Sequence, residues 1–158
     1  MATPRGRGRR HHASHSRPGR LADHGGGQDL TGDYDAAENE LQQALAVLRT
    51  VVAPDDEAEA LNHLGTLRRL TGHSDQARAL HQEALTIAHD HGHRIEEARA
   101  LEGIGRAAAD LGNTAFAAVH LQQALRLYQA LGVPEATQVA ADLAAVHPRP
   151  QHRGQPQP

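Results

Sequence analysis

Hydrophobic and small residues recur along the central part of the chain at the spacing of an α-helix. Two segments place leucine, isoleucine or alanine three or four residues apart, at about 56–71 and 95–111. Three more carry a wider stripe of alanine and leucine, at about 33–51, 74–90 and 114–130. Pro134 opens a last helix at about 134–146, because proline is favoured in a first helical turn. The pattern therefore predicts an all-α protein.

The pattern also repeats every 40 residues without a gap. The segments "LTGDYDAAENELQQAL", "LTGHSDQARALHQEAL" and "DLGNTAFAAVHLQQAL" align at this offset, and four columns agree in all three. These columns hold Gly32, Gly72 and Gly112; Ala37, Ala77 and Ala117; Ala44, Ala84 and Ala124; and Leu45, Leu85 and Leu125. A period of this length indicates a solenoid of stacked units. Each unit consists of a first helix, helix A, and a second helix, helix B.

Glycines mark the expected turns of these units. One glycine is expected between helix A and helix B in each copy: Gly32, Gly72 and Gly112. Asp33 and Asn113 follow two of them and are expected to cap the next helix with their side-chain oxygens. Gly92 aligns with Gly132 and is expected to end helix B.

These features resemble the tetratricopeptide repeat (TPR). The family signature places a leucine–glycine pair on helix A, a glycine at the turn and two alanines on helix B. The matching residues are Leu61, Leu64, Gly65, Gly72, Ala77 and Ala84 in one copy, and Leu101, Ile104, Gly105, Gly112, Ala117 and Ala124 in the next. The resemblance implies a short right-handed superhelix of antiparallel helix pairs over 30–146, with about two and a half repeats and a C-terminal capping helix.

The chain departs from the family pattern in places. The period is 40 rather than 34 residues, and His81 stands where an aromatic is expected on helix B. The segment "LYQALGVPEATQVAADLA" is similar to the closing part of TPR tails on actinobacterial transcriptional regulators with a nucleotide-binding core. No helix A is evident at 17–31, which favours a fragment of a longer regulator. The face of helix 33–51 is therefore expected to be incompletely covered.

The two ends of the chain differ in composition from its central part. Residues 1–20 carry six arginines and no acidic residue, and 1–29 show no apolar period. We expect 1–29 to form a disordered arm and the Pro/Gln-rich segment 147–158 a disordered tail. No apolar run approaches the roughly 20 residues of a membrane span, and no apolar core of a signal peptide follows the N-terminal charges. The sequence therefore predicts a soluble cytoplasmic protein.

The stretch "HDHGH" (89–93) is the densest group of candidate metal ligands. Because Gly92 should end helix B, His89 and His93 would not lie one turn apart on an intact helix. A chain with thirteen histidines makes such a cluster less informative. We therefore expect a solvated loop, with no metal or other cofactor. No nucleophile–base pair or paired carboxylates stand out either, so we expect no enzymatic activity.

The inner face of a TPR stack comes mainly from helix A, and helical spacing selects its candidate partner-binding residues. These are Glu59, Asn62, Thr66, Arg69, Arg99, Glu102 and Arg106. The resemblance implies a non-enzymatic, regulatory interaction module that binds a peptide or partner domain in this groove. The alternative is a solvated face, since Arg99–Glu102 and Glu102–Arg106 have the spacing of intrahelical ion pairs.

Two further points stay open at this stage. His81 is expected to be a partly buried histidine between helices, the alternative being a ligand contact or a pH sensor. The arginine-rich arm could contact phosphates, which makes a nucleic-acid-associated protein the second hypothesis. It is less favoured because the arm lacks interleaved aromatic residues. The oligomeric state is left undetermined.

Overall fold

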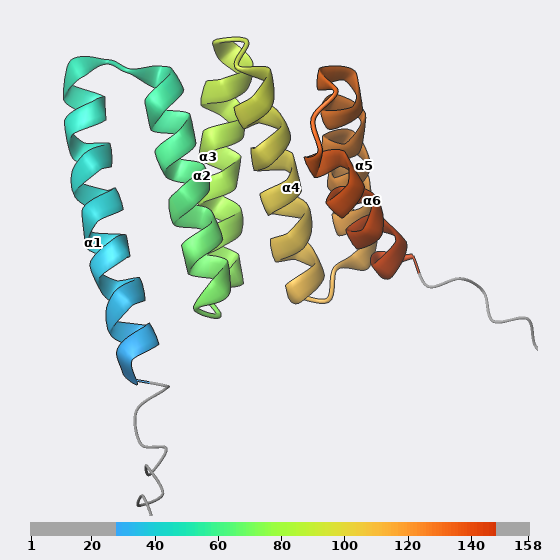
Figure 1. Cartoon of the computed structure of the whole chain (residues 1–158), viewed down its shortest axis with the longest axis horizontal. Helices are drawn as coiled ribbons and strands as arrows, with labels where there is room; N and C mark the ends of the chain where they lie inside the picture. The colour runs from blue at the N-terminus through green and yellow to red at the C-terminus, as the bar shows by residue number, and fades with distance from the viewer. Residues whose placement is uncertain (1–27, 148–158) are drawn as a thin grey trace, which may run out of the picture.

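The computed structural model describes residues 28–147, which form six helices and no strand (Figure 1). The helices are α1 (Gln28–Val51), α2 (Pro54–Leu70), α3 (Ser74–Asp90), α4 (Arg94–Asp110), α5 (Thr114–Leu131) and α6 (Glu135–Val146). The predicted all-α repeat architecture is confirmed. The arm expected at 1–29 and the tail expected at 147–158 lie outside the described residues, apart from Gln28, Asp29 and His147.

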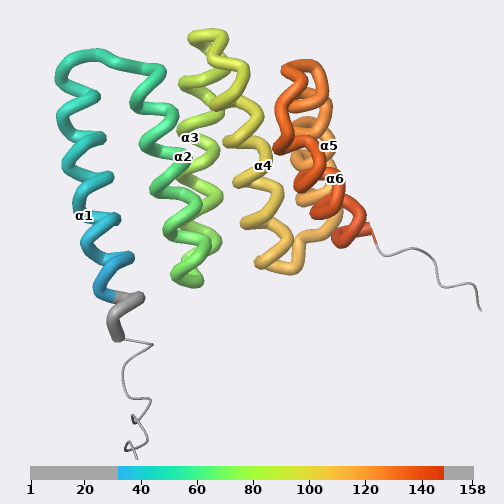
Figure 2. Tube along the Cα trace, viewed as in Figure 1, coloured from blue at the N-terminus to red at the C-terminus, as the bar shows by residue number. Residues whose placement is uncertain are grey.

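The helices follow one another as an antiparallel stack (Figures 1 and 2). Each helix packs against the next one in the chain. Helix α2 also packs against α4, and α4 against α6, whereas the backbones of α1, α3 and α5 do not come close to one another. Side chains still bridge them, since Arg49 of α1 lies 2.6 Å from Glu83 of α3. The A-type helices α2, α4 and α6 are therefore closer together than the B-type helices. The stack curves so that α2 and α4 line its inner face.

Glycines reverse the chain at four helix ends. Gly72, Gly92, Gly112 and Gly132 have φ between 68° and 84°, a region that is costly for residues with a Cβ. The expected N-cap at Asn113 is confirmed, because its side chain accepts a hydrogen bond of 3.2 Å from the Phe116 amide.

The turn expected at Gly32 is absent, and the prediction that Asp33 caps a helix is wrong. Both residues lie inside α1, which begins at Gln28. Gly32 does not adopt a positive φ, unlike its counterparts Gly72 and Gly112. A glycine in a helix costs only about 1 kcal/mol relative to alanine, so it does not end a helix by itself.

The core is built from leucines set against small residues. Ala77, Ala84, Ala117 and Ala124 are fully buried, so the B helices approach their neighbours closely. A Cβ placed on Gly105 would lie 2.7 Å from the Leu121 side chain, which shows how tightly α4 and α5 pack. Tyr128 is fully buried in the same cluster, beside Val139 of α6.

Helix α1 is covered on one side only. Leu45 is its single buried residue between 32 and 51, and Ala44 is exposed although its counterparts Ala84 and Ala124 are buried. Within residues 28–147, the backbone of α1 lies close to α2 alone, and Arg49 of α1 reaches Glu83 of α3 through its side chain at 2.6 Å. The expectation that this face is incompletely covered is confirmed for the described part of the chain.

Candidate functional site

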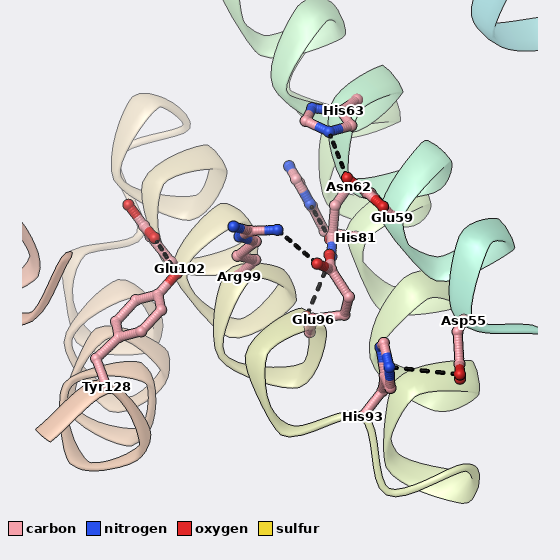
Figure 3. Close-up of polar contacts among 10 residues, drawn as sticks. All are labelled: Asp55, Glu59, Asn62, His63, His81, His93, Glu96, Arg99, Glu102 and Tyr128. Carbon is pink, nitrogen blue, oxygen red and sulfur yellow. Dashed lines mark hydrogen bonds and ion pairs between the residues drawn. The ribbon is translucent and has the colours of Figure 1, made fainter. Parts of the chain in front are cut away.

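Helices α2 and α4 border a pocket of about 170 Å³ on the inner face. Six of the seven residues selected by helical spacing line it: Asn62, Thr66, Arg69, Arg99, Glu102 and Arg106. Glu59 does not line the pocket, and its carboxylate lies 3.5 Å from Nε2 of His63 at the rim (Figure 3). The residues that helical spacing places on one face of α2 and of α4 therefore come together in one pocket. We call this pocket the inner groove.

A buried hydrogen-bond network centred on Asn62 forms the floor of the inner groove (Figure 3). The Asn62 amide nitrogen donates to the backbone oxygen of Glu96 at 3.1 Å and to its Oε2 at 3.0 Å. Glu96 in turn accepts a hydrogen bond of 2.5 Å from Arg99. Asn62, which we selected as a partner contact, is thus largely committed to joining α2 to α4.

His81 reaches into this network from α3. Its Nδ1 lies 3.0 Å from Oδ1 of Asn62, and the Asn62 amide nitrogen already faces Glu96. Nδ1 must therefore carry the proton and donate to Oδ1, which leaves Nε2 as an acceptor. Nε2 is buried and has no hydrogen-bond partner among the described residues.

Two glycines make room for the imidazole ring. A Cβ on Gly65 would lie 2.7 Å from the ring, and one on Gly103 would lie 2.3 Å from it. Burial, and next the positive charge of Arg69, lower the pKa of His81 to about 4. His81 was expected to be partly buried, but it is fully enclosed because its ring fills the space beside these glycines.

The arginines of the inner groove are already paired with carboxylates. Arg69 lies 3.1 Å from Asp110, the last residue of α4, and Arg106 lies 2.7 Å from Asp142 of α6. The predicted Glu102–Arg106 pair is present at 2.8 Å. The predicted Arg99–Glu102 pair is not, because Arg99 turns to Glu96. The inner groove therefore offers polar atoms but little uncompensated charge.

Glu102 has a second partner that sequence spacing did not indicate. The Tyr128 hydroxyl of α5 donates a hydrogen bond of 2.6 Å to Glu102 Oε2 (Figure 3). Burial and this bond raise the pKa of Tyr128. The Glu102 carboxylate is therefore shared between Arg106, at Oε1, and Tyr128, at Oε2. The groove residues His63, Glu96 and Gly103 were also missed, since their roles arise from contacts between helices.

The histidines of "HDHGH" take part in separate contacts. His89 Nδ1 lies 3.2 Å from Glu97, whereas His93 Nε2 lies 3.4 Å from Asp55 of α2 (Figure 3). Helix α3 ends at Asp90, and Gly92 turns the chain with φ 71°. Nowhere in 28–147 do three or more histidine or acidic side chains gather closely enough to hold a metal ion.

A larger and more apolar pocket lies between α3 and α5 on the outer face. Its volume is about 550 Å³, and Leu85, Leu101 and Leu127 are among its lining residues. It exists because the backbones of α3 and α5 do not come close to each other, so the wedge between the B helices stays open. Its lining lacks the buried polar network of the inner groove.

The family comparison agrees with this geometry. The family model described as tetratricopeptide repeat matches residues 28–90 and 56–130, which together span most of the six helices. The chain belongs to the tetratricopeptide repeat family. TPR stacks generally mediate protein–protein interaction and are typically not enzymes. No curated protein matches this TPR chain. None of the helices described here is long and apolar enough to cross a membrane.

Proposed function

We propose that this TPR protein is a non-enzymatic interaction module that binds a peptide segment of a partner protein in the inner groove. The observation that carries the proposal is the convergence of polar side chains from α2 and α4 on one pocket. Two rigid helices hold these side chains, which is the arrangement that gives a binding site a fixed geometry.

The free hydrogen-bonding groups favour an uncharged polar peptide. Thr66 and His63 are exposed at the inner groove, and each guanidinium retains N–H donors beyond those in its ion pair. An acidic peptide would gain little attraction from these arginines, because Glu96, Asp110 and Asp142 already offset their charge. Backbone carbonyls of an extended segment can accept from the remaining donors without breaking a pair.

A regulatory role in the cytoplasm is part of the same proposal. The likeness of 127–144 to the TPR tails of actinobacterial regulators supports it. The second hypothesis, nucleic-acid binding through the arginine-rich arm, depends on residues 1–20, which lie outside the described part. A steep salt dependence of DNA affinity that disappears on deleting 1–27 would favour that hypothesis.

A peptide-display selection tests the groove proposal. Random peptides selected on the full chain are measured for affinity against Thr66→Arg and against Gln82→Arg, its matched control. Thr66 is exposed in the inner groove and Gln82 is exposed on α3 outside it, so both variants should fold. We expect the first to weaken binding at least about tenfold, as expected when a long side chain occupies a site, and the second to leave it unchanged. Equal affinity for both variants would contradict groove binding.

A further inference from the structure

A further pocket lies between α4 and α6, next to the inner groove, and has a volume of about 350 Å³. Arg69 and Arg106 line both this pocket and the inner groove, so the two are adjacent. The apolar part of its lining comes from α4, α5 and α6 and consists of Ala109, Leu121, Ala145 and Val146. We call this pocket the α6 pocket.

The α6 pocket is the counterpart of the inner groove one repeat further along the chain. Positions 69, 81 and 106 line the inner groove, and the positions 40 residues later, 109, 121 and 146, line the α6 pocket. In the inner groove these positions hold Arg69, His81 and Arg106. In the α6 pocket they hold Ala109, Leu121 and Val146. The lining therefore changes from polar to apolar along the stack.

The charged groups of the α6 pocket are already paired with other residues of the chain. One carboxylate oxygen of Asp142 accepts a hydrogen bond of 2.7 Å from Arg106, and the other accepts one of 3.0 Å from Gln138. Asp110 accepts a hydrogen bond of 3.1 Å from Arg69. A charged ligand would gain little attraction here, so the α6 pocket favours an uncharged apolar side chain.

The volumes of the two pockets indicate that one ligand uses both. The inner groove, at about 170 Å³, is smaller than the roughly 300–1,000 Å³ of an ordinary ligand pocket. The α6 pocket brings the pair within that range. Its space stays open because alanine stands at Ala109, where the preceding repeat has the long side chain of Arg69.

We propose that the α6 pocket receives one large apolar side chain of the peptide that binds in the inner groove. The inference rests on the proposed function and defines the partner more closely, as a segment in which a leucine, methionine or phenylalanine adjoins uncharged polar residues. The polar part meets Thr66 and the donors left on the arginines, and the apolar side chain packs against Ala109, Ala145 and Val146. A buried anchor of this kind supplies much of the affinity of a complex.

Matched substitutions on α6 test the inference with peptides selected on the full chain. Ala144 and Ala145 are both exposed, and of the two Ala145 lines the α6 pocket. Glutamine is uncharged and a good helix former, so both variants should fold. Ala145→Gln places a long polar side chain at the pocket and should weaken binding roughly tenfold, whereas Ala144→Gln should leave it unchanged. Equal affinity of the two variants would overturn the inference.

A substitution in the peptide locates its apolar residue. Alanine in place of that residue should weaken binding to the unsubstituted chain roughly tenfold and binding to Ala145→Gln much less, because the two changes remove the same contact. Equal losses for the two proteins would mean that the apolar residue binds elsewhere, and the inference would be wrong.

Thr66→Arg separates a failure of the inference from a failure of the proposed function. Weaker binding to Thr66→Arg with unchanged binding to Ala145→Gln would keep the peptide in the inner groove and overturn the α6 pocket alone. Unchanged binding to Thr66→Arg would overturn the proposed function, and the inference with it. Tighter binding to Ala145→Gln would mean that another occupant, such as residues 148–158 that follow His147, had filled the α6 pocket, which also contradicts the inference.

Discussion

Helices α1 and α3 share the repeat pattern, but their environments differ. Helix α3 lies between α2 and α4, and its Ala77, His81 and Ala84 are buried. The corresponding alanines of α1 are Ala37, which is half-buried, and Ala44, which is exposed. The difference shows that the spacing of small residues specifies which side of a helix can be packed closely. Whether that side is packed depends on a neighbouring helix.

The largest effect is expected from truncation of Leu121, which lies between Ala117 and Ala124 on α5. Leu121 of α5 is 1% exposed against Gly105, whereas its counterpart Leu41 in α1 is only partly buried. We expect Leu121→Ala to lower the free energy of unfolding by about 2–5 kcal/mol, since it removes buried methyl groups and leaves a cavity. Leu41→Ala should cost less than half as much.

Urea unfolding followed by circular dichroism measures both costs. Equal losses for the two variants would mean that α1 is as well covered in solution as α5, and the contrast between the two ends of the stack would be wrong.

The fold could be predicted from the sequence because its signals are local. Helical spacing gives the helices, and glycines give the reversals where the chain must adopt a positive φ, as at Gly72 and Gly112. Gly32 shows the limit of this reasoning. The same residue type in the same column continues a helix, because a glycine permits a turn but does not impose one.

The candidate site was only partly predictable. Spacing on one helix correctly grouped Asn62, Thr66 and Arg69 on one face. It could not show that Asn62 bonds to His81 and Glu96, which are 19 and 34 residues away. Such partners depend on how the helices are stacked. The sequence alone could therefore not show which polar groups of the inner groove are already hydrogen-bonded to other residues of the chain.

The second prediction concerns His81 of α3. The same repeat position is leucine in the other two B helices, Leu41 in α1 and Leu121 in α5. Its pKa is about 4 in the folded protein, below the usual 6.5, so the unfolded chain binds more protons between these values. Stability should therefore fall as the pH drops from 6.5 toward 4, by up to roughly 3 kcal/mol from this residue. The contribution is fully present above pH 6.5.

His81→Leu isolates this contribution, because leucine occupies the same column at Leu121 beside Gly105. The measurement is the free energy of unfolding of both proteins at pH 7 and near pH 4. We expect the unsubstituted chain to lose more stability than the variant over this interval. Parallel losses would show that His81 is accessible to protons in the folded state.

The smallest predicted effect lies at the C-terminal end of α1. Val52 has φ 55°. It occupies the repeat position that is glycine after the other two B helices, Gly92 after α3 and Gly132 after α5. A valine in this region is strained, at a cost of about 1–2 kcal/mol, and glycine offsets part of the gain by its freedom in the unfolded chain. Val52→Gly should therefore raise the free energy of unfolding by about 0.5–1 kcal/mol.

The reciprocal change, Gly92→Val, should lower stability by about 0.5–1 kcal/mol, because the strain of valine is partly offset by its smaller freedom in the unfolded chain. Nothing lies within 4 Å of a Cβ at Gly92, so its cost would be conformational and not steric. Thermal and urea unfolding of dilute samples compare the two variants. Val52 is 81% exposed, and its side chain therefore has little packing to lose in a single copy. If Val52→Gly is neutral, the two helix ends are equivalent despite their different residues, and the contrast between α1 and α3 is confined to the uncovered side of α1.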